Sequence, residues 1–247
     1  KAILIMADGQ VKELEETQKN ETIELAGVTL RKSGNEIRYT PVPSDSLAGS
    51  RLSGEHNILK TPTGGEYKLI LSDGTRVWLN SQTVLRYPVN FTGKERLVYL
   101  EGEAYFDVAH NDKCPFIVNT RTEVNIQVLG TAFNVRAYPD EIQIETVLEQ
   151  GSVKMWQHSS NITLVPGTKG VFNKNNGEFS TEEVNTELYT AWYKGQYVFE
   201  EETIENILTR LSRWYDIHVF FADQKARNMV FSGSIRKYET IHQFLQA

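Results

Sequence analysis

The chain has 247 residues, of which 40% are apolar, and this length and composition suit one large domain or two unequal ones. Its 32 acidic and 26 basic residues give a net charge of −6, which argues against a nucleic-acid-binding protein because phosphate binding needs a basic face. No apolar run approaches the roughly 20 residues of a membrane-spanning helix, and the single cysteine, Cys114, excludes an internal disulfide.

The first three quarters of the chain carry the pattern of β-strands. Apolar and polar residues alternate from Ile3 to about Val184, most clearly over residues 124–128, 133–137 and 142–145. Glycine-containing turns separate these runs at short intervals. We therefore predict a mainly β region that folds as a β-roll, a solenoid-like domain or a sandwich.

Three local features add detail to the β region. The run from Leu4 to Gly9 is similar to the run from Leu69 to Gly74, which predicts two strand–turn units that are built alike. Residues 41–55 are rich in Pro, Ser and Gly without periodicity, and we predict an exposed loop there. Because the chain begins at Lys1 without an initiator Met, we interpret its start as a cut within, or just before, a first strand.

The last quarter changes to a mixed pattern. Residues 187–194 predict a short helical connector, and residues 204–215 predict a helix whose apolar side chains form one stripe. Short β-rich runs at 196–199, 217–221 and 230–235 predict a small sheet for this helix to pack on. The predicted inter-domain packing residues are Leu188, Tyr189, Trp192 and Trp214.

A motif at the start of the predicted helix occurs twice. Thr203-Ile204-Glu205-Asn206-Ile207-Leu208 is repeated as Thr240-Ile241-His242-Gln243-Phe244-Leu245, which predicts a second helix that is cut short at Ala247. The order of elements predicts an all-β domain over residues 1–185, a connector over 186–195 and a small, incomplete α+β domain of βαββα order over 196–247.

The sequence offers no pattern for catalysis or for a cofactor. Its five histidines make no metal-binding pair at helical spacing, and neither a nucleophile elbow nor a phosphate-binding loop is present. Glu101 and Glu103 fall on one face of a predicted strand and are interpreted as a solvated pair. We predict that the protein is not an enzyme and needs no cofactor or metal; a cupin-like enzyme would need a cluster of histidines and carboxylates.

A second class of function remains open, namely a β-rich carbohydrate-binding module. Four tryptophans contribute to an aromatic content of 11%, and an exposed, coplanar pair of rings would mark a sugar-binding surface. Trp78 has apolar neighbours and Trp214 ends the helical stripe, so we interpret these two as packing residues.

Several motifs, taken in order, resemble the FecR family of sigma-factor regulators. The similarity runs through Thr61-Pro62-Thr63-Gly64-Gly65-Glu66-Tyr67-Lys68-Leu69, Leu71-Ser72-Asp73-Gly74-Thr75-Arg76-Val77-Trp78-Leu79-Asn80, Leu85-Arg86-Tyr87-Pro88, Glu101-Gly102-Glu103-Ala104-Tyr105-Phe106-Asp107-Val108, Pro115-Phe116-Ile117-Val118, Val128-Leu129-Gly130-Thr131-Ala132-Phe133-Asn134-Val135, Glu149-Gln150-Gly151-Ser152-Val153 and Leu164-Val165-Pro166-Gly167. The segment from Tyr197 to Ile217 resembles the family's closing domain, which is similar to the STN module of secretins and TonB-dependent receptors.

The resemblance implies a role in signalling. It implies the periplasmic region of a single-pass inner-membrane anti-sigma factor in a Gram-negative bacterium, which receives a signal from an outer-membrane TonB-dependent transducer. The implied partners are the signalling domain of that transducer, site proteases and, only through a cytoplasmic segment absent from this chain, an extracytoplasmic-function (ECF) sigma factor.

A small sheet with a free edge invites pairing with a strand of another protein. We therefore expect the partner to bind along residues 217–221 or 230–235. The predicted partner-binding residues are Ile217, Val219, Phe221, Val230, Phe231, Ser232 and Ile235.

Overall fold

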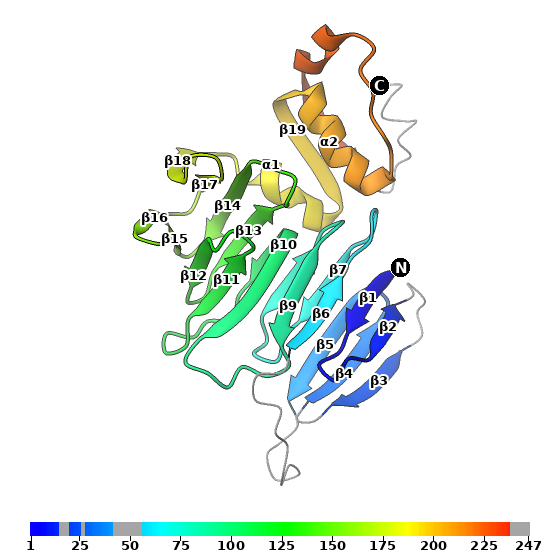
Figure 1. Ribbon diagram of the computed structural model, residues 1–247, viewed down its shortest axis with the longest axis vertical. Coiled ribbons are helices and arrows are strands. Elements are labelled where there is room, and N and C mark those ends of the chain that lie inside the picture. The colour runs from blue at the N-terminus through cyan, green and yellow to red at the C-terminus, as the bar shows by residue number, and fades with distance from the viewer. Residues whose placement is uncertain (15–19, 26–27, 42–55, 238–247) are drawn as a thin grey trace.

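The computed structural model describes residues 1–14, 20–25, 28–41 and 56–237 (Figure 1). Strands dominate as far as residue 183, and the sequence reason is the alternation of apolar and polar residues, which appears as alternating burial along most strands. These strands are β1 (Ala2–Ile5), β2 (Val11–Leu14), β3 (Glu21–Leu25), β4 (Val28–Ser33), β5 (Glu36–Pro41), β6 (His56–Lys60), β7 (Tyr67–Ile70), β8 (Arg76–Leu79), β9 (Val84–Pro88), β10 (Arg96–Asp107), β11 (Phe116–Thr120), β12 (Asn125–Val128), β13 (Ala132–Ala137), β14 (Gln143–Gln150), β15 (Val153–Gln157), β16 (Ser160–Leu164), β17 (Thr168–Asn173) and β18 (Glu178–Glu183).

The strands pair in two ladders that share β10. The first ladder, called sheet A, has the order β2-β1-β6-β9-β10-β11-β12-β15-β16. The second, called sheet B, has the order β3-β4-β5-β7-β8-β10-β13-β14-β17-β18. Most neighbouring pairs are antiparallel; β10 with β11 and β5 with β7 are parallel.

The 12-residue strand β10 passes from sheet A to sheet B at Gly102. Its first half pairs with β9 and β11, and its second half pairs with β8 and β13. Gly102 has a φ of +109°, and a Cβ there would lie 2.7 Å from the Cα of Thr83 and 2.5 Å from its hydroxyl oxygen. Only glycine suits this corner for two reasons. A side chain at residue 102 would clash with Thr83, and the positive φ of residue 102 is a conformation that other residues rarely adopt.

The core lies between the two sheets and is continuous. The largest fully buried side chains include Tyr87, Phe106, Phe116 and Phe133, and the rings of Phe106 and Phe133 stack with centroids 5.2 Å apart. Side chains from both sheets belong to one cluster, so the β region is a single packed unit. The prediction of a mainly β domain followed by a small α+β domain is confirmed.

The two strand–turn units that the sequence predicts to be alike have the same hydrogen bonds. In the first, the amide of Gly9 donates to the carbonyl of Met6 at 2.9 Å and the carboxylate of Asp8 accepts from an amide two residues later at 2.9 Å. In the second, Gly74 donates to Leu71 at 2.9 Å and Asp73 accepts in the same way at 3.0 Å. The local similarity in sequence therefore reflects one turn geometry used twice.

The connector consists of α1 (Glu187–Thr190) and the 3-10 turn η2 (Ala191–Lys194). It leads to a C-terminal module, defined here as residues 196–237, which contains β19 (Gln196–Thr203), α2 (Ile204–Tyr215), the 3-10 turn η3 (Gln224–Asn228) and β20 (Val230–Arg236). Figure 1 shows this module in yellow to red at one end of the β region.

The module has a small core of its own. Helix α2 begins after Thr203, whose hydroxyl accepts a hydrogen bond from the amide of Asn206 at 3.3 Å as an N-cap. The apolar stripe of α2 packs on the antiparallel pair of β19 and β20. The buried side chains of this core are Tyr197, Phe199, Ile207, Leu211 and Ile235. The helix predicted from the stripe is therefore confirmed.

One predicted strand of the module is wrong. Residues 217–221 form no strand, and Phe220 in the middle of this run is 90% exposed. The predicted second helix from Thr240 lies outside the described residues, as does the predicted loop beyond Pro41. Within the described part of the chain, every helix is too short or too polar to cross a lipid bilayer.

Candidate functional site

The connector lies on the outer face of sheet B and is fixed there by polar contacts. Trp192 is 5% exposed, and its indole N–H donates to the side-chain oxygen of Asn134 on β13 at 3.0 Å. Thr190 donates to the carboxylate of Glu149 on β14 at 2.7 Å. The ring of Tyr193 stacks on Tyr105 with a centroid distance of 3.9 Å. The sheet therefore holds the segment that leads into the C-terminal module.

The end of α2 forms a second contact with the β region. The indole N–H of Trp214 donates to the side-chain oxygen of Asn80 at 3.0 Å, and the carbonyl of Arg213 accepts from the amide of Gly64 at 2.9 Å and from the hydroxyl of Ser81. A Cβ on Gly64 would lie 2.9 Å from the carbonyl oxygen of Trp214. Glycine is needed here because the helix end approaches the turn backbone so closely.

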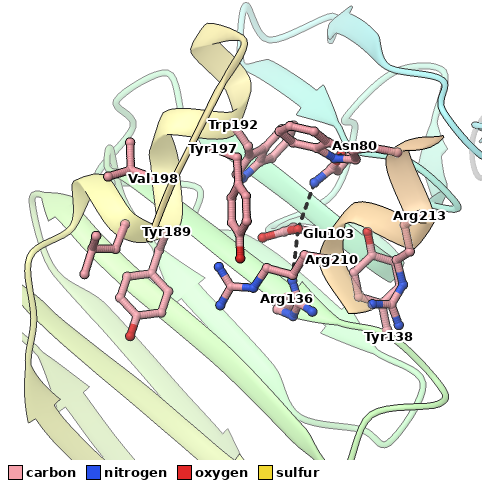
Figure 2. A pocket seen from close by; sticks show the side chains of 12 residues that line it. Asn80, Glu103, Arg136, Tyr138, Tyr189, Trp192, Tyr197, Val198, Arg210 and Arg213 are labelled. Carbon is pink, nitrogen blue, oxygen red and sulfur yellow. Dashed lines mark hydrogen bonds and ion pairs between the residues drawn. The ribbon is translucent and has the colours of Figure 1, made fainter. Parts of the chain in front are cut away.

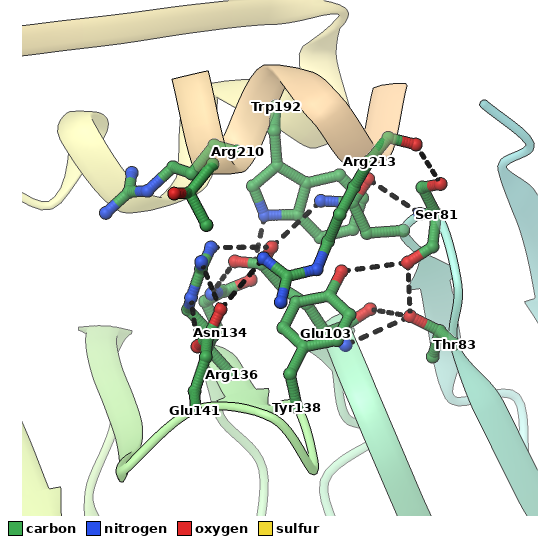
Figure 3. A network of polar contacts seen from close by, with 12 residues as sticks. Ser81, Thr83, Glu103, Asn134, Arg136, Tyr138, Glu141, Trp192, Arg210 and Arg213 are labelled. Carbon is green, nitrogen blue, oxygen red and sulfur yellow. Dashed lines mark hydrogen bonds and ion pairs between the residues drawn. The ribbon is translucent and has the colours of Figure 1, made fainter. Parts of the chain in front are cut away.

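A network of charged groups fills the space between these two contacts (Figure 3). Glu103 on β10 is 6% exposed and accepts hydrogen bonds from the side-chain amides of Asn80 at 2.9 Å and Asn134 at 3.0 Å. Arg136 lies 3.6 Å from Glu103 and makes two hydrogen bonds to Glu141, at 2.8 and 2.6 Å. Burial alone would lower the pKa of Arg136, but these two carboxylates outweigh it and raise the pKa above its usual value.

Arg213 carries the network from the β region into α2. Its side chain is 7% exposed, lies 2.7 Å from Asp140 and 2.9 Å from Glu141, and covers the ring of Tyr138 with its guanidinium carbon 4.0 Å from the centroid. Burial raises the pKa of Tyr138, whose hydroxyl donates to the carbonyl of Ser81 at 2.8 Å. The network thus joins β10, β13, the turn after β8 and α2, and each of these buried charges lies beside a charge of opposite sign.

Figure 2 shows the enclosed space that remains at this junction. Its volume is about 20 Å³, and it is lined by side chains of both parts, among them Glu103, Arg136, Tyr197 and Arg210. This is room for about one water molecule, so the junction is a packed contact and too small for an organic ligand. No cluster of three or more His, Cys, Asp or Glu side chains suited to a metal ion occurs in the described part of the chain.

The predicted inter-domain residues lie at this junction. Trp192 and Trp214 make the indole hydrogen bonds to the β region, Leu188 lines the enclosed space, and the hydroxyl of Tyr189 accepts from the ammonium of Lys169 on β17 at 3.1 Å. Sequence reasoning missed Glu103, which it interpreted as solvated, and the arginines that accompany it. The covering connector lies almost 90 residues further along the chain, so no local signal identifies this burial.

The predicted partner-binding residues divide into exposed and buried ones. Val230 is 55% exposed and Phe231 is 44% exposed, whereas Ile235 is 5% exposed and packs in the module's own core. Ser232 is exposed and accepts from the amide of Glu201 at 2.9 Å. In the segment that forms no strand, Val219 is 38% exposed, while Ile217 and Phe221 are half-buried.

Exposed apolar side chains are concentrated in this part of the module. Among the described residues, nine large apolar side chains are exposed, and five of them fall between residues 219 and 231. These five are called the exposed apolar set of the module: Val219, Phe220, Met229, Val230 and Phe231. Beside them, β20 pairs with β19 on one edge and has no partner strand on the other within the ranges described above. Because exposed apolar surface is a common mark of interaction sites, this set is a candidate for one.

Comparisons with known proteins agree with the order of the two parts. The family model described as FecR protein matches residues 57–154, and the model described as FecR, C-terminal matches residues 196–247. The chain is similar to a crystal structure, at 1.65 Å, of a candidate anti-sigma factor from Parabacteroides distasonis ATCC 8503, with 31% identity, a TM-score of 0.70, and coverage of 76% of this chain and 88% of the other.

A second crystal structure with the same description, at 2.50 Å, gives 31% identity, a TM-score of 0.67, and coverage of 77% of this chain and 89% of the other. Comparison with curated proteins gives no significant match.

Proposed function

Because this chain belongs to the FecR family of anti-sigma factors, we propose that it is the signal-receiving region of a transmembrane sigma regulator and that it acts through protein–protein contact. In this proposal the region lies in the periplasm of a Gram-negative bacterium, next to a membrane helix outside the chain. The family regulates sigma factors, so the expected chemistry is recognition of a partner. The partner we propose is the signalling domain of an outer-membrane TonB-dependent transducer.

The observation that carries the proposal is the exposed apolar set of the module beside the open edge of β20. An incoming strand that pairs with this edge would gain main-chain hydrogen bonds, and its side chains could cover Val230 and Phe231. Natural proteins usually protect open edges with charges or prolines, yet the first five residues of β20 are Val230, Phe231, Ser232, Gly233 and Ser234. This edge therefore resembles an acceptor strand more than a protected one.

In the proposed arrangement the chain has three parts with different tasks. Residues 196–247 receive the partner, residues 186–195 form the connector, and residues 1–185 form a β domain that holds the module in place. The ECF sigma factor would bind a cytoplasmic segment outside this chain, and site proteases would act after the partner has bound. The junction described above supports the task of the β domain, because it fixes both the connector and α2 to sheet B.

The test is calorimetry with the periplasmic signalling domain of the transporter that is encoded beside this protein. We expect saturable binding, and we expect Phe231→Pro and Ser232→Pro to abolish it because a proline ring removes a donor and disturbs strand pairing. Val230→Glu should also weaken binding by placing a charge within the exposed apolar set. Val165→Glu is the matched control, since Val165 is another exposed valine, 61% exposed, in the β region.

The variants must first show the far-UV circular dichroism of the parent, so that loss of binding is not loss of folding. Binding that survives both proline substitutions would refute the open-edge proposal. Equal weakening by Val230→Glu and Val165→Glu would show that charge alone, and not the exposed apolar set of the module, controls the affinity.

A further inference from the structure

A row of side chains crosses the outer face of sheet A, on the opposite side of the core from the junction. The register places Arg86 beside Tyr99, Tyr99 beside Asn119, Asn119 beside Asn125, and Asn125 beside Trp156. The neighbouring residues along these strands point the other way and are in the core: Leu85, Val98, Leu100, Val118, Ile126 and Met155. The row is therefore a surface feature that no other described element covers.

Trp156 is the one tryptophan of the four that takes no part in the junction. Trp192 and Trp214 make hydrogen bonds there, and Trp78 packs against Tyr193 of the connector with centroids 5.2 Å apart. Trp156 is half-buried in β15, and its indole N–H has no hydrogen-bond acceptor among the residues described. The packing of the two domains therefore does not explain why a tryptophan occupies position 156.

The row has aromatic rings at two positions and side-chain amides between them. From Tyr99 to Trp156 it crosses three strand spacings, which is about 14 Å. Asn119 donates to the side-chain oxygen of Asn125 at 2.8 Å, so that the two amides hold each other in place. Such a surface is amide-lined, and it suits a ligand that presents hydroxyl groups along its edge and C–H groups on its face, because C–H hydrogens are attracted to the negative face of an aromatic ring.

A hollow with excess positive charge lies at the Tyr99 end of the row. It has a volume of about 290 Å³, and its lining includes Arg86, Tyr99, Glu101, Asn119 and Arg121. Arg121 pairs with Glu101 at 3.4 Å, whereas Arg86 has no carboxylate partner within the described chain and lies over the ring of Tyr99 at 5.2 Å. In a chain of net charge −6, this hollow has two guanidinium groups and one carboxylate.

We propose that the outer face of sheet A binds an acidic polysaccharide. The sugar rings would lie across β10, β11, β12 and β15, with the ring of Trp156 as the stacking surface and a sugar carboxylate at Arg86, whose planar guanidinium can bind it with two hydrogen bonds. An acidic peptide is the other ligand that would satisfy the charge. It fits less well, because extended peptides are recognised at strand edges and in grooves, and this row lies across the middle of a sheet.

The test is native gel electrophoresis of the whole chain with a soluble polysaccharide in the gel matrix. Three acidic polymers serve as probes, namely polygalacturonate, alginate and hyaluronate, with dextran as the neutral polymer and poly-glutamate as the acidic peptide. We expect at least one acidic polysaccharide to retard the protein, and dextran and poly-glutamate to leave its mobility unchanged. Absence of retardation by all three acidic polysaccharides would overturn the proposal, and so would equal retardation by poly-glutamate.

Three variants locate the site. Trp156→Ala and Arg86→Gln should each weaken binding about tenfold, the factor that corresponds to a stacking or charge contribution of about 1.4 kcal/mol. Ile142→Ala is the matched control, because Ile142 is an apolar side chain that is 57% exposed outside the row, and its binding should equal that of the parent. Retardation that is unchanged in Trp156→Ala and Arg86→Gln, with melting temperatures equal to the parent's, would place the polysaccharide elsewhere.

Discussion

Glu141 is the central carboxylate of the junction, and its substitution tests whether the charged network holds the C-terminal module in place. It contacts Arg136 at 2.8 and 2.6 Å and Arg213 at 2.9 Å, and its side chain is 21% exposed. Glu141→Gln leaves two buried guanidinium groups with less negative charge nearby. Removal of one partner of a buried pair costs about 3–5 kcal/mol, and partial exposure reduces our expectation to about 2–3 kcal/mol.

Two substitutions at and beside Arg213 give costs in stability with which Glu141→Gln can be compared. Arg213→Met should cost about 1–2 kcal/mol, because Glu141 keeps its contacts with Arg136 and the main losses are the cation–π contact with Tyr138 and the two ion pairs of Arg213, with Asp140 and Glu141. Asp140→Asn should cost less than about 0.5 kcal/mol, since the Asp140 side chain is 71% exposed and its ion pair is screened by water.

The assay is urea unfolding observed in two ways. Tryptophan fluorescence reports on the junction, where three of the four tryptophans lie, and far-UV circular dichroism is dominated by the β region. We expect the urea midpoint measured by fluorescence to decrease most in Glu141→Gln, less in Arg213→Met and least in Asp140→Asn. For each variant, the midpoint measured by circular dichroism should change less than the fluorescence midpoint. An Asp140→Asn variant as destabilised as Glu141→Gln would refute the reasoning from burial.

Two further predictions concern polar groups at the same junction. Trp192→Phe should cost about 1–3 kcal/mol in urea unfolding because it leaves the buried oxygen of Asn134 without its donor, whereas Trp214→Phe should cost about 1 kcal/mol, since its acceptor keeps a backbone donor. Glu66 and Lys237 form a desolvated ion pair: burial raises the pKa of Glu66 above 4.5 and lowers that of Lys237 below 10.5, although each partner opposes the shift of the other. In Lys237→Met only the raising effects remain on the pKa of Glu66, so the loss of stability in thermal melts should be largest at neutral pH and should shrink as the pH falls through the raised pKa of the folded carboxyl, where it takes up a proton. A loss that grows as the pH falls would contradict this sign.

Local patterns were sufficient to predict the strands and the helix of the module. The alternation over residues 124–128 and 133–137 corresponds to β12 and β13, because one face of each strand is in the core and the other is not. The apolar stripe over residues 204–215 corresponds to α2, with Thr203 as the N-cap. In both cases the buried positions repeat with the period of the secondary structure. This spacing of apolar residues lies within one segment and is therefore visible in the sequence.

The same kind of pattern failed at residues 217–221 and at Glu103. The first run is apolar enough for a strand, but a strand also needs a hydrogen-bonding partner, and pairing partners are not encoded in one segment. Glu103 looks solvated in its own strand, and it is buried because Trp192 and Arg213 arrive from distant parts of the chain. Contacts between domains depend on where elements meet, so the charged network could be found only in the folded structure.

The polar character of the junction bears on how a signal could pass through it. An apolar contact is costly to separate because its surfaces meet water, whereas charged groups such as Arg136 and Arg213 recover hydration when they separate.

The connector ends at Gly195, directly before β19, and β19 pairs with β20. A partner that pairs with β20 would therefore act on a sheet joined through one residue to Trp192 and η2. We expect binding at the open edge and loosening of the junction to be coupled, and hydrogen exchange at the amide of Gly64, which donates to the carbonyl of Arg213, should increase when the partner binds. Unchanged protection at this amide in the complex would show that the module receives its partner without any effect on the β domain.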